Sequence, residues 1–336
     1  MKKISILFTD YPDSFFPEQS CIIEALRKHY EVCFDMDNPD FVFYSNFGLK
    51  HLSYSNAVRI HFSYENTFPN FNVCDFSLSH ARDLINGRNL HFPLALIKPV
   101  TSTIIRAENP YNRPFCSFVY NQSTLGEGAK LRKLFCEFLS STYRKVDCPG
   151  KVLNNMHAQE LAVRNDKKNW QSTKINFLNK YKFNIAFENS DSDGYITEKL
   201  TDAFLADTVP IYWGSRGNIR PFPKDAIICA QDFDSFESLT NYIKEVDSNE
   251  ELYNSILQKN PFHSEDFAQK TNDALSSFLC SIVDNEIVVK DKDMGKNDPV
   301  YHLLPFAIIS NEERNFLTKL INYYYKLKPY LKRRKM

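Results

Sequence analysis

The sequence predicts an α/β protein built from two Rossmann-like, doubly wound halves, and three observations support this fold class. The stretch 181–215 reads as a buried strand, a short polar loop, a helix and a second strand, which is the pattern of a βαβ unit in a parallel sheet. The first hundred residues alternate between apolar strands and helical segments. The length of 336 residues is large for one average core and suits two domains.

The first half is expected over residues 1–105 and contains one well-marked helix. That helix is predicted for Pro17–Tyr30, because Ile22, Leu26 and Tyr30 recur on one side. Short apolar runs predict the strands 4–8, 31–34, 41–44, 58–62, 76–78 and 90–92.

The second half is expected over residues 106–300. Several prolines between 98 and 114 interrupt the periodicity and indicate a linker there. A strand at 115–120 is followed by a helix at 129–140, and Arg132 falls outside the apolar face of that helix. Further strands are predicted at 183–187, 209–213 and 226–229. Further helices are predicted from Thr197, which is expected to be the N-cap, at 236–246, at 250–257 and at 265–283.

The βαβ stretch also predicts an anion-binding edge. Helix N-termini attract anions, and parallel sheets bind ligands at the carboxyl ends of their strands, so a diphosphate would fit there. Lys199 lies in the first helical turn, where the helix dipole repels a cation, and a bound anion would remove that conflict. Glu198 beside it suits the dipole and could accept hydrogen bonds from sugar hydroxyls. The alternative is that both are ordinary solvated helix-start residues.

Composition narrows the class of protein. The 41 basic and 41 acidic residues balance, so no global field attracts nucleic acid. The eight cysteines are scattered singly, which is typical of reduced core thiols and favours a cytoplasmic protein. The apolar run that starts at Ile4 ends after five residues, too short for a signal peptide, and we expect no membrane-spanning segment.

The end of the chain, 301–336, is predicted to be a helical tail rich in basic and aromatic residues. Between Lys319 and Met336 there are seven basic residues and no acid, interleaved with tyrosines and leucines. Such a segment favours peripheral contact with an anionic membrane surface. A merely solvated tail is the alternative, and nucleic acid is a weaker one because nothing else in the chain supports it.

The βαβ stretch resembles the signature of the α1,3/4-fucosyltransferases, an inverting glycosyltransferase family. The resemblance consists of three ordered segments, FEN at 187–189, GYITEK at 194–199 and PIYWG at 210–214. It implies a GT-B fold with two domains facing across a cleft, the first binding the acceptor and the second binding GDP-fucose. It also implies an acceptor glycan that contains galactose or N-acetylglucosamine.

The resemblance assigns roles to particular residues. Glu65 follows the strand at 58–62, where a general base would lie, and the segment 65–71, ENTFPNF, matches the family segment that carries the proposed base. Arg132 occupies the place of the arginine that grips the diphosphate. The nearby histidine His61 has no clear family counterpart, and we interpret it as a core or strand-face residue.

The expected donor site consists of five residues, and no cofactor is required. Arg132 and Lys199 would neutralise the diphosphate, while ribose, phosphate or fucose would be positioned by Asn189, Tyr195 and Glu198. The triplet Asp191-Ser192-Asp193 resembles the metal-binding motif of other glycosyltransferases, but divalent metal is not expected, because Lys199 and Arg132 already supply positive charge. The polar segment 157–173 has no assigned role.

The expected function is transfer of L-fucose, with inversion, to an N-acetylglucosamine hydroxyl of a lactosamine-type glycan. The product would be a Lewis-type antigen on a bacterial surface polysaccharide, with an α1,3 or α1,4 linkage. Two alternatives remain. One is a glycosyltransferase that uses another GDP-sugar, such as GDP-mannose, and the other is a non-catalytic protein that binds a glycan or a nucleotide on the same scaffold.

Overall fold

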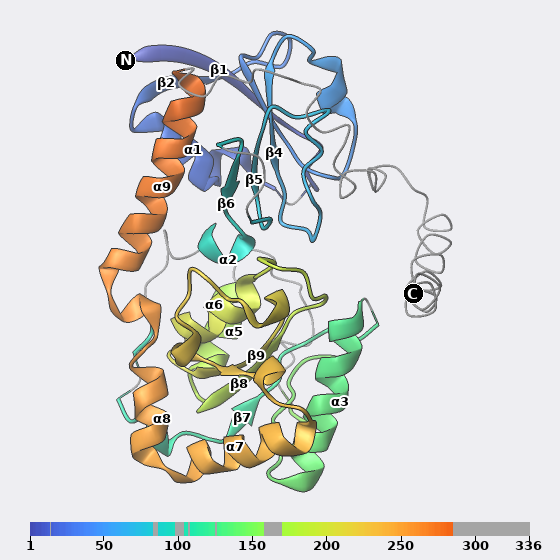
Figure 1. The fold of residues 1–336 in the computed structure, drawn as a ribbon, viewed down its shortest axis with the longest axis vertical. Coiled ribbons are helices and arrows are strands. Elements are labelled where there is room, and N and C mark those ends of the chain that lie inside the picture. The colour runs from blue at the N-terminus through green and yellow to red at the C-terminus, as the bar shows by residue number, and fades with distance from the viewer. Residues whose placement is uncertain are drawn as a thin grey trace, which may run out of the picture.

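The computed structural model describes residues 1–13, 15–82, 87–97, 104–106, 108–124, 126–157 and 170–284. Over these residues the chain forms two parallel β-sheets, one in each half, with helices packed around them (Figure 1). The predicted α/β fold class with two Rossmann-like halves is confirmed. The expected basic tail, 301–336, and residues 158–169 of the polar segment lie outside the described residues.

The first sheet has six strands in the order β2-β1-β3-β4-β5-β6, and all neighbouring strands run parallel. The chain therefore winds outward from β1 in both directions, which is the doubly wound arrangement, with its switch point between β1 and β3. The strands are β1 (Lys2–Thr9), β2 (Tyr30–Phe34), β3 (Phe41–Tyr44), β4 (Val58–Phe62), β5 (Phe76–Ser79) and β6 (Asn89–His91).

The first helix is shorter than the predicted Pro17–Tyr30. Residues 17–19 form a 3-10 turn, and helix α1 covers only Cys21–Arg27. The reason is local, because Ser20 has extended backbone and its side chain accepts a hydrogen bond from the Ile22 amide, which makes Ser20 the N-cap. Tyr30 is the first residue of β2 and belongs to the sheet.

The second sheet has four parallel strands in the order β10-β9-β8-β7. They are β7 (Cys116–Ser117), β8 (Phe183–Phe187), β9 (Val209–Trp213) and β10 (Ile228–Cys229). Strand β7 is shorter than the predicted 115–120, because the backbone after Ser117 leaves β8. The Phe118 amide instead donates to the Asp147 carbonyl oxygen over 2.9 Å.

Helices cover both faces of the second sheet, which explains why β8 is almost uninterruptedly apolar. Phe183, Ile185 and Phe187 pack into a core shared with α3, α7 and α8, whereas Ala186 faces the core that contains α6. Both faces are therefore dry, as expected for a parallel strand. The helices of this half are α3 (Glu127–Thr142), α5 (Trp170–Leu178), α6 (Glu198–Leu205), α7 (Phe236–Ser248) and α8 (Glu250–Leu257).

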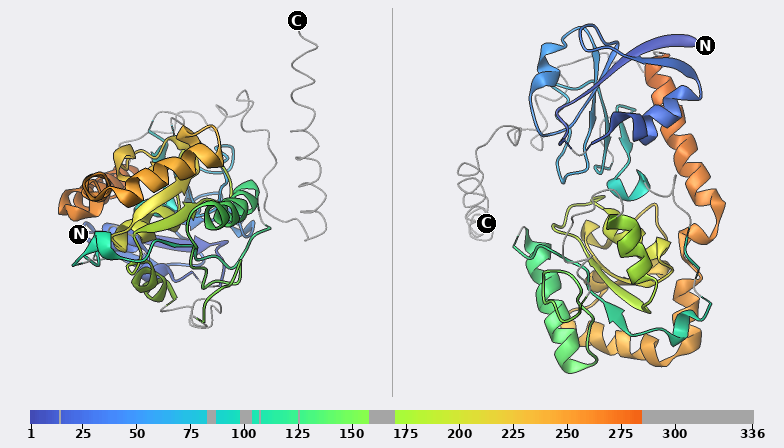
Figure 2. Two further views of the ribbon diagram at one scale, coloured as in Figure 1. Left: turned by 90° about the horizontal axis from the view of Figure 1, so that it is seen from below. Right: turned by 180° about the vertical axis from the view of Figure 1, so that it is seen from behind.

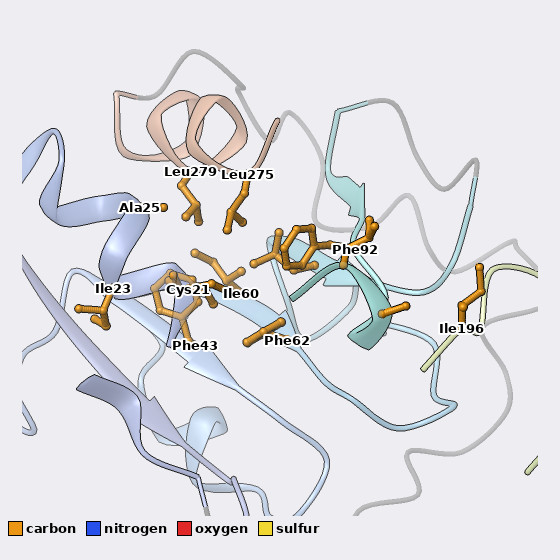
Figure 3. Close-up of a cluster of buried hydrophobic side chains, with 14 of the residues drawn as sticks. Cys21, Ile23, Ala25, Phe43, Ile60, Phe62, Phe92, Ile196, Leu275 and Leu279 are labelled. Carbon is orange, nitrogen blue, oxygen red and sulfur yellow. The ribbon is translucent and has the colours of Figure 1, made fainter. Parts of the chain in front are cut away.

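Helix α9 (Glu265–Val283) follows the second half in sequence but packs on the first. Leu275 and Leu279 lie among the buried side chains of α1 and β4, including Ala25 and Ile60 (Figure 3). At the end of the helix, the Lys2 ammonium donates to the Val283 carbonyl oxygen over 2.7 Å. The helix thus runs along the side of the molecule and ties the two halves together (Figures 1 and 2).

The two halves also touch directly below the first sheet. The amide of Ala95, in helix α2 (Leu94–Ile97), donates to the Ile196 carbonyl oxygen over 3.1 Å. The domain boundaries expected from the sequence, after residues 105 and 300, stay a prediction. Among the described residues, no helix combines the length and apolar character needed to cross a bilayer.

Candidate active site

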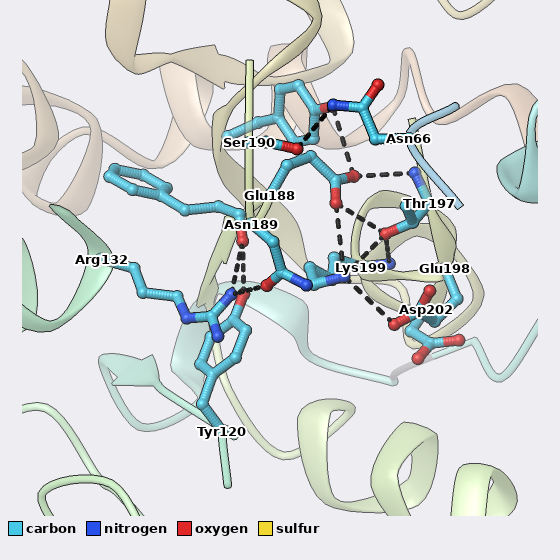
Figure 4. A network of polar contacts seen from close by, with 12 residues as sticks. Asn66, Tyr120, Arg132, Glu188, Asn189, Ser190, Thr197, Glu198, Lys199 and Asp202 are labelled. Carbon is cyan, nitrogen blue, oxygen red and sulfur yellow. Dashed lines mark hydrogen bonds and ion pairs between the residues drawn. The ribbon is translucent and has the colours of Figure 1, made fainter. Parts of the chain in front are cut away.

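The predicted βαβ unit is present, and it places a helix N-terminus at the carboxyl edge of the second sheet. Strand β8 ends at Phe187, and α6 begins at Glu198 after the loop 188–197. Thr197 is the N-cap, as expected, and its hydroxyl accepts a hydrogen bond from the Lys199 amide. The loop and the first helical turn therefore bring several polar side chains together (Figure 4).

Glu188 lies at the centre of this edge and is fully buried. Its carboxylate accepts hydrogen bonds from the Thr197 amide and the Thr197 hydroxyl, each over 2.7 Å. Burial raises the pKa of Glu188 above its ordinary value, against the opposing effect of the Lys199 charge. Glu188 belongs to the FEN segment at 187–189, but no role for it was predicted from the sequence. Its place in that segment was the available signal.

Lys199 is buried, and its ammonium is held by Glu188 and Glu198. Its Nζ lies 3.3 Å from Glu188 Oε2 and 3.4 Å from Glu198 Oε1, and donates to the Thr197 hydroxyl over 2.9 Å. Burial acts to lower the pKa of Lys199, but the two carboxylates outweigh it and hold the pKa above its ordinary value. The expected conflict with the helix dipole is therefore already relieved inside the protein, without a bound anion.

Glu198 is the partly exposed member of the pair. Burial acts to raise its pKa, but the Lys199 charge, assisted by Lys174, outweighs burial and holds the pKa of Glu198 at about 2. The reading of Glu198 and Lys199 as solvated helix-start residues is wrong for Lys199, which is 9% exposed. Glu198 keeps a carboxylate that a hydroxyl-bearing ligand can reach.

Arg132 projects from α3 toward the end of β8 and is 2% exposed. Its Nη1 donates to the Asn189 side-chain oxygen over 2.7 Å, and its Nη2 donates to the Gln122 carbonyl oxygen over 2.6 Å. The guanidinium also lies 3.9 Å from the ring centroid of Tyr120, in cation–π geometry. Within the described residues its Nε has no hydrogen-bond partner. Tyr120 was missed by the sequence analysis, which treated it only as part of a strand.

Burial changes the electrostatics of this arginine. It lowers the pKa of Arg132 from its ordinary value, while Tyr120 and Glu188 act in the opposite direction. A guanidinium stays charged under such conditions. The carboxyl edge of the second sheet therefore holds two fixed cations, Arg132 and Lys199, joined through Asn189 and Glu188. A charge that is shielded from water interacts more strongly with a nearby anion than the same charge in solvent.

Tyr195 lies where the two halves meet. It is buried, and its ring packs edge-on against His80 of the first half, with centroids 5.5 Å apart. Burial is the main reason that the pKa of Tyr195 is raised, and the negative charges of Glu188 and Glu65 add to the effect. The charge of the Glu65 carboxylate therefore affects the Tyr195 phenol across the junction of the halves.

Glu65 is exposed and follows β4, at the carboxyl edge of the first sheet. Its neighbour Asn66 crosses to the second half, where the side-chain amide donates to the Ser190 and Ser192 hydroxyls over 2.7 and 2.8 Å. The loop that carries the expected base is therefore attached to the loop that carries Asn189. Asn66 and both serines were not singled out from the sequence.

His61 is a buried strand-face histidine, as expected. Its Nε2 lies 3.1 Å from the Asn46 side-chain oxygen, and burial lowers its pKa to about 3. It does not reach the loop of Glu65 by any hydrogen bond among those that the described residues form.

The two aspartates of the Asp191-Ser192-Asp193 triplet are held by protein groups. Asp191 accepts hydrogen bonds from the Arg216 amide and from Gln231, and Asp193 pairs with Arg82 at 3.3 Å. In the described part of the chain, no group of three or more histidine, cysteine or acidic side chains is arranged to hold a metal ion. All eight cysteines are free thiols.

Two parallel-sheet halves that meet at polar loops, with fixed cations at the carboxyl edge of the second, are the architecture of a GT-B glycosyltransferase. Residues 6–97 match the N-terminal domain of an alpha-(1,3)-fucosyltransferase, and residues 116–293 match the C-terminal part of glycosyltransferase family 10 (fucosyltransferase). The chain belongs to glycosyltransferase family 10.

Individual relatives agree with this assignment. An alpha-(1,3)-fucosyltransferase of Helicobacter pylori is 29% identical over an alignment of 294 residues that covers 76% of this chain and 57% of the relative. A mouse 4-galactosyl-N-acetylglucosaminide 3-alpha-L-fucosyltransferase is 50% identical over 78 residues, or 23% of this chain and 22% of the relative. This chain thus spans little more than half of the first relative and less of the second.

Solved structures show the same fold. A crystal structure of an alpha1,3-fucosyltransferase superposes with a TM-score of 0.66 at 25% identity, covering 87% of this chain and 93% of the other. A structure of an alpha1,3-fucosyltransferase with GDP-fucose gives a TM-score of 0.65 at 24% identity, covering 86% and 92%.

Proposed function

We propose that this protein is an α1,3-fucosyltransferase that uses GDP-β-L-fucose as its donor. The proposal rests on the two fixed cations, Arg132 and Lys199, at the carboxyl edge of the second sheet. Both lie within residues 116–293, which match the family. The solved relative with GDP-fucose has the same fold. The acceptor is proposed to be the N-acetylglucosamine of a lactosamine-type glycan, in keeping with the name of the mouse relative.

In the proposed reaction, the diphosphate lies at the start of α6 and beside Arg132. Lys199 and Arg132 neutralise its charge, and the unpaired Nε of Arg132 is a donor available to a phosphate oxygen. Asn189, which Arg132 orients, and Glu198 would contact ribose, phosphate or fucose. Tyr195 would close the site at the junction of the halves.

The chemical step is a single displacement. The acceptor hydroxyl oxygen forms a bond to the anomeric carbon of fucose as the bond to the diphosphate oxygen breaks. Glu65 takes the hydroxyl proton, and GDP leaves with the electron pair of the broken bond. Attack from the face opposite the leaving group inverts the anomeric centre. An exposed carboxylate at the edge of the first sheet suits the base, because the acceptor must reach it from solvent.

Glu65→Gln is expected to lower turnover by about two to four orders of magnitude, because the amide accepts no proton. The affinity for GDP-fucose should be kept, since Glu65 is on the half opposite the fixed cations. Steady-state kinetics and calorimetric titration with GDP-fucose measure the two quantities. Glu18→Gln, an exposed position on the first half, is the matched control. Near-normal turnover of Glu65→Gln would rule Glu65 out as the base.

The acceptor and linkage are tested by incubating the protein with GDP-fucose and a panel of galactose- and N-acetylglucosamine-containing glycans. Mass spectrometry detects the product, and linkage analysis distinguishes O3 from O4. Thermal-shift measurements with GDP-fucose and GDP-mannose compare the two donor classes. A protein that binds GDP-fucose but neither transfers nor hydrolyses it would be the non-catalytic alternative. Formation of a Lewis-type structure on a bacterial polysaccharide, and membrane contact through 319–336, stay predictions.

A further inference from the structure

A second cavity lies between the two halves, on the side covered by α9. It has a volume of about 620 Å³, opens to solvent and is lined by β6, α2, the loop at Arg220 and the N-terminal half of α9. Its polar lining is formed by Arg82, His91, Arg220, Lys270 and Thr271. Its apolar lining is formed by Leu90, Phe92, Leu96, Pro221, Phe267 and Ala274.

This cavity is separate from the candidate active site. The Gly194 backbone, in the loop between Asn189 and Thr197, is pressed against the first half beside His91, which lines the cavity. A Cβ built on Gly194 would lie 2.0 Å from the His80 carbonyl oxygen and 2.9 Å from His91 Cε1. The contact leaves no room for a side chain there. Glu65, Arg132 and Lys199 are absent from the described residues that line the cavity.

The lining of the cavity has a clear charge pattern. The described residues that line it include Arg82, Arg220 and Lys270 and no acidic residue. Arg82 is partly neutralised by Asp193, 3.3 Å away. Within the part of the chain that the structure describes, neither Arg220 nor Lys270 forms an ion pair with an acidic side chain. The described part of the lining therefore carries net positive charge beside apolar side chains.

We propose that this cavity binds an amphipathic anion, a molecule with a phosphate or carboxylate at one end and an apolar body. The anionic end lies against Arg220 and Lys270, and the body packs on Phe92, Leu96 and Phe267. Cations at the mouth of a concave site with apolar walls attract such a ligand, and the volume is that of a small-molecule site. This site is independent of the fucosyl transfer proposed above.

The position of the cavity gives the ligand a physical effect on the whole protein. Its walls come from the first half, from the second half and from α9, which joins them. A ligand that touches all three binds best to one arrangement of the halves and shifts the population toward it. Occupancy is therefore expected to stabilise the full chain against thermal unfolding.

Calorimetric titration with three probes tests the chemistry. The probes are hexyl phosphate, inorganic phosphate and hexyl glucoside, each added to the full chain in the presence of saturating GDP. Hexyl phosphate is expected to bind at least about ten times more tightly than either other probe, because only it carries both features. Equal affinity for inorganic phosphate, or binding of hexyl phosphate only when GDP is left out, would overturn the proposal.

Variants locate the site. The double substitution Arg220→Gln, Lys270→Gln is expected to weaken hexyl phosphate binding at least about tenfold, and Ala274→Phe, which fills the cavity without changing its charge, should do the same. Lys145→Ala, at a lysine whose side chain is 67% exposed and which is absent from the cavity lining, should bind like wild type. Unchanged binding by both cavity variants, with thermal unfolding unchanged, would contradict the assignment.

Discussion

Lys199 is expected to have two roles: its charge stabilises the fold, and it binds the diphosphate of the proposed donor. The two roles can be measured separately. Its ammonium offsets the buried Glu188 and the partly exposed Glu198. Removing one partner of a buried ion pair leaves an uncompensated charge, which costs about 3–5 kcal/mol of unfolding free energy. The same ammonium would also be missing from the diphosphate site.

Lys199→Met is expected to lower both the stability of the protein and its affinity for GDP. The affinity should fall at least about tenfold, because a charge-assisted interaction is lost. Thermal unfolding and calorimetry measure the two effects.

The double substitution Lys199→Met, Glu188→Gln provides the control for Lys199→Met. Neutralising Glu188 should restore much of the stability, since no unpaired charge is then buried, but it should not restore GDP affinity. Recovery of both would mean that Lys199 acts only by holding the fold.

The buried side chain of His80 is expected to make the stability of the fold depend on pH in the acid range. Both of its ring nitrogens lack hydrogen-bond partners within the described residues, and burial, together with His91, lowers its pKa to about 4. An unfolded chain protonates histidine near pH 6.5. The folded state therefore binds fewer protons between these values. This contribution to stability is complete above about pH 6.5 and is lost as the pH falls toward about 4.

His80→Phe is expected to flatten the loss of stability between about pH 6.5 and about pH 4, because it removes one group that must stay neutral in the fold. Urea midpoints measured across this range give the slope. His29→Phe, at an exposed position, should retain the wild-type slope. A His80→Phe slope identical to wild type would show that other groups dominate acid unfolding.

The elements around the site are closely packed where α3 meets the end of β8. The Gly128 amide donates to the Asn189 carbonyl oxygen over 2.9 Å. A Cβ on Gly128 would lie 2.1 Å from the Glu188 carbonyl oxygen and 2.5 Å from Trp213 Cζ3. This close approach sets the depth at which Arg132 enters the site from α3.

Gly128→Ala is expected to destabilise the protein by about 1–3 kcal/mol, because the methyl group overpacks a backbone contact. It should also weaken GDP binding by moving Arg132. Denaturant unfolding and calorimetry measure both effects, with Glu127→Ala, an exposed change in the same helical turn, as the control. A stable Gly128→Ala protein with wild-type GDP affinity would contradict this account.

At the scale of the whole molecule, two features hold the halves in register. Helix α9 packs against α1 and the first sheet through Leu275 and Leu279, and Asn66 links the loop of Glu65 to Ser190 and Ser192. Helix α9 holds the first half through apolar packing, whereas Asn66 lies within the polar loops. We therefore expect Asn66 to affect the geometry of the reaction rather than the stability of the fold.

Asn66→Ala is expected to lower turnover about tenfold, because two hydrogen bonds of about 1 kcal/mol each no longer hold the loops together. Affinity for GDP should change little. Hydrogen exchange of residues 189–196 should become faster, and kinetics and calorimetry measure the other two quantities. Asn72→Ala, at an exposed asparagine in the following loop, is the matched control. If exchange and turnover both stay at wild-type values, Asn66 does not couple the halves.

Much of the fold and part of the site could be predicted from local sequence patterns. Strands β8 and β9 and helix α6 were predicted from apolar runs and from an N-cap at Thr197. These signals come from residues that are close together in the sequence. The boundaries of α1 and β7 were wrong, because Ser20 caps the helix locally and the chain after Ser117 pairs with Asp147. Distant pairing of this kind leaves no local pattern.

The sequence by itself determined the α/β class, the family motifs and the chemical types at the site, since these follow from short-range spacing. The tertiary structure decided which groups meet. It buried Glu188 against Lys199, placed Tyr120 under Arg132, joined Asn66 to the opposite half and returned α9 to the first sheet. Partners far apart in the chain are selected by packing and by the need to satisfy buried charge, and both depend on the assembled core.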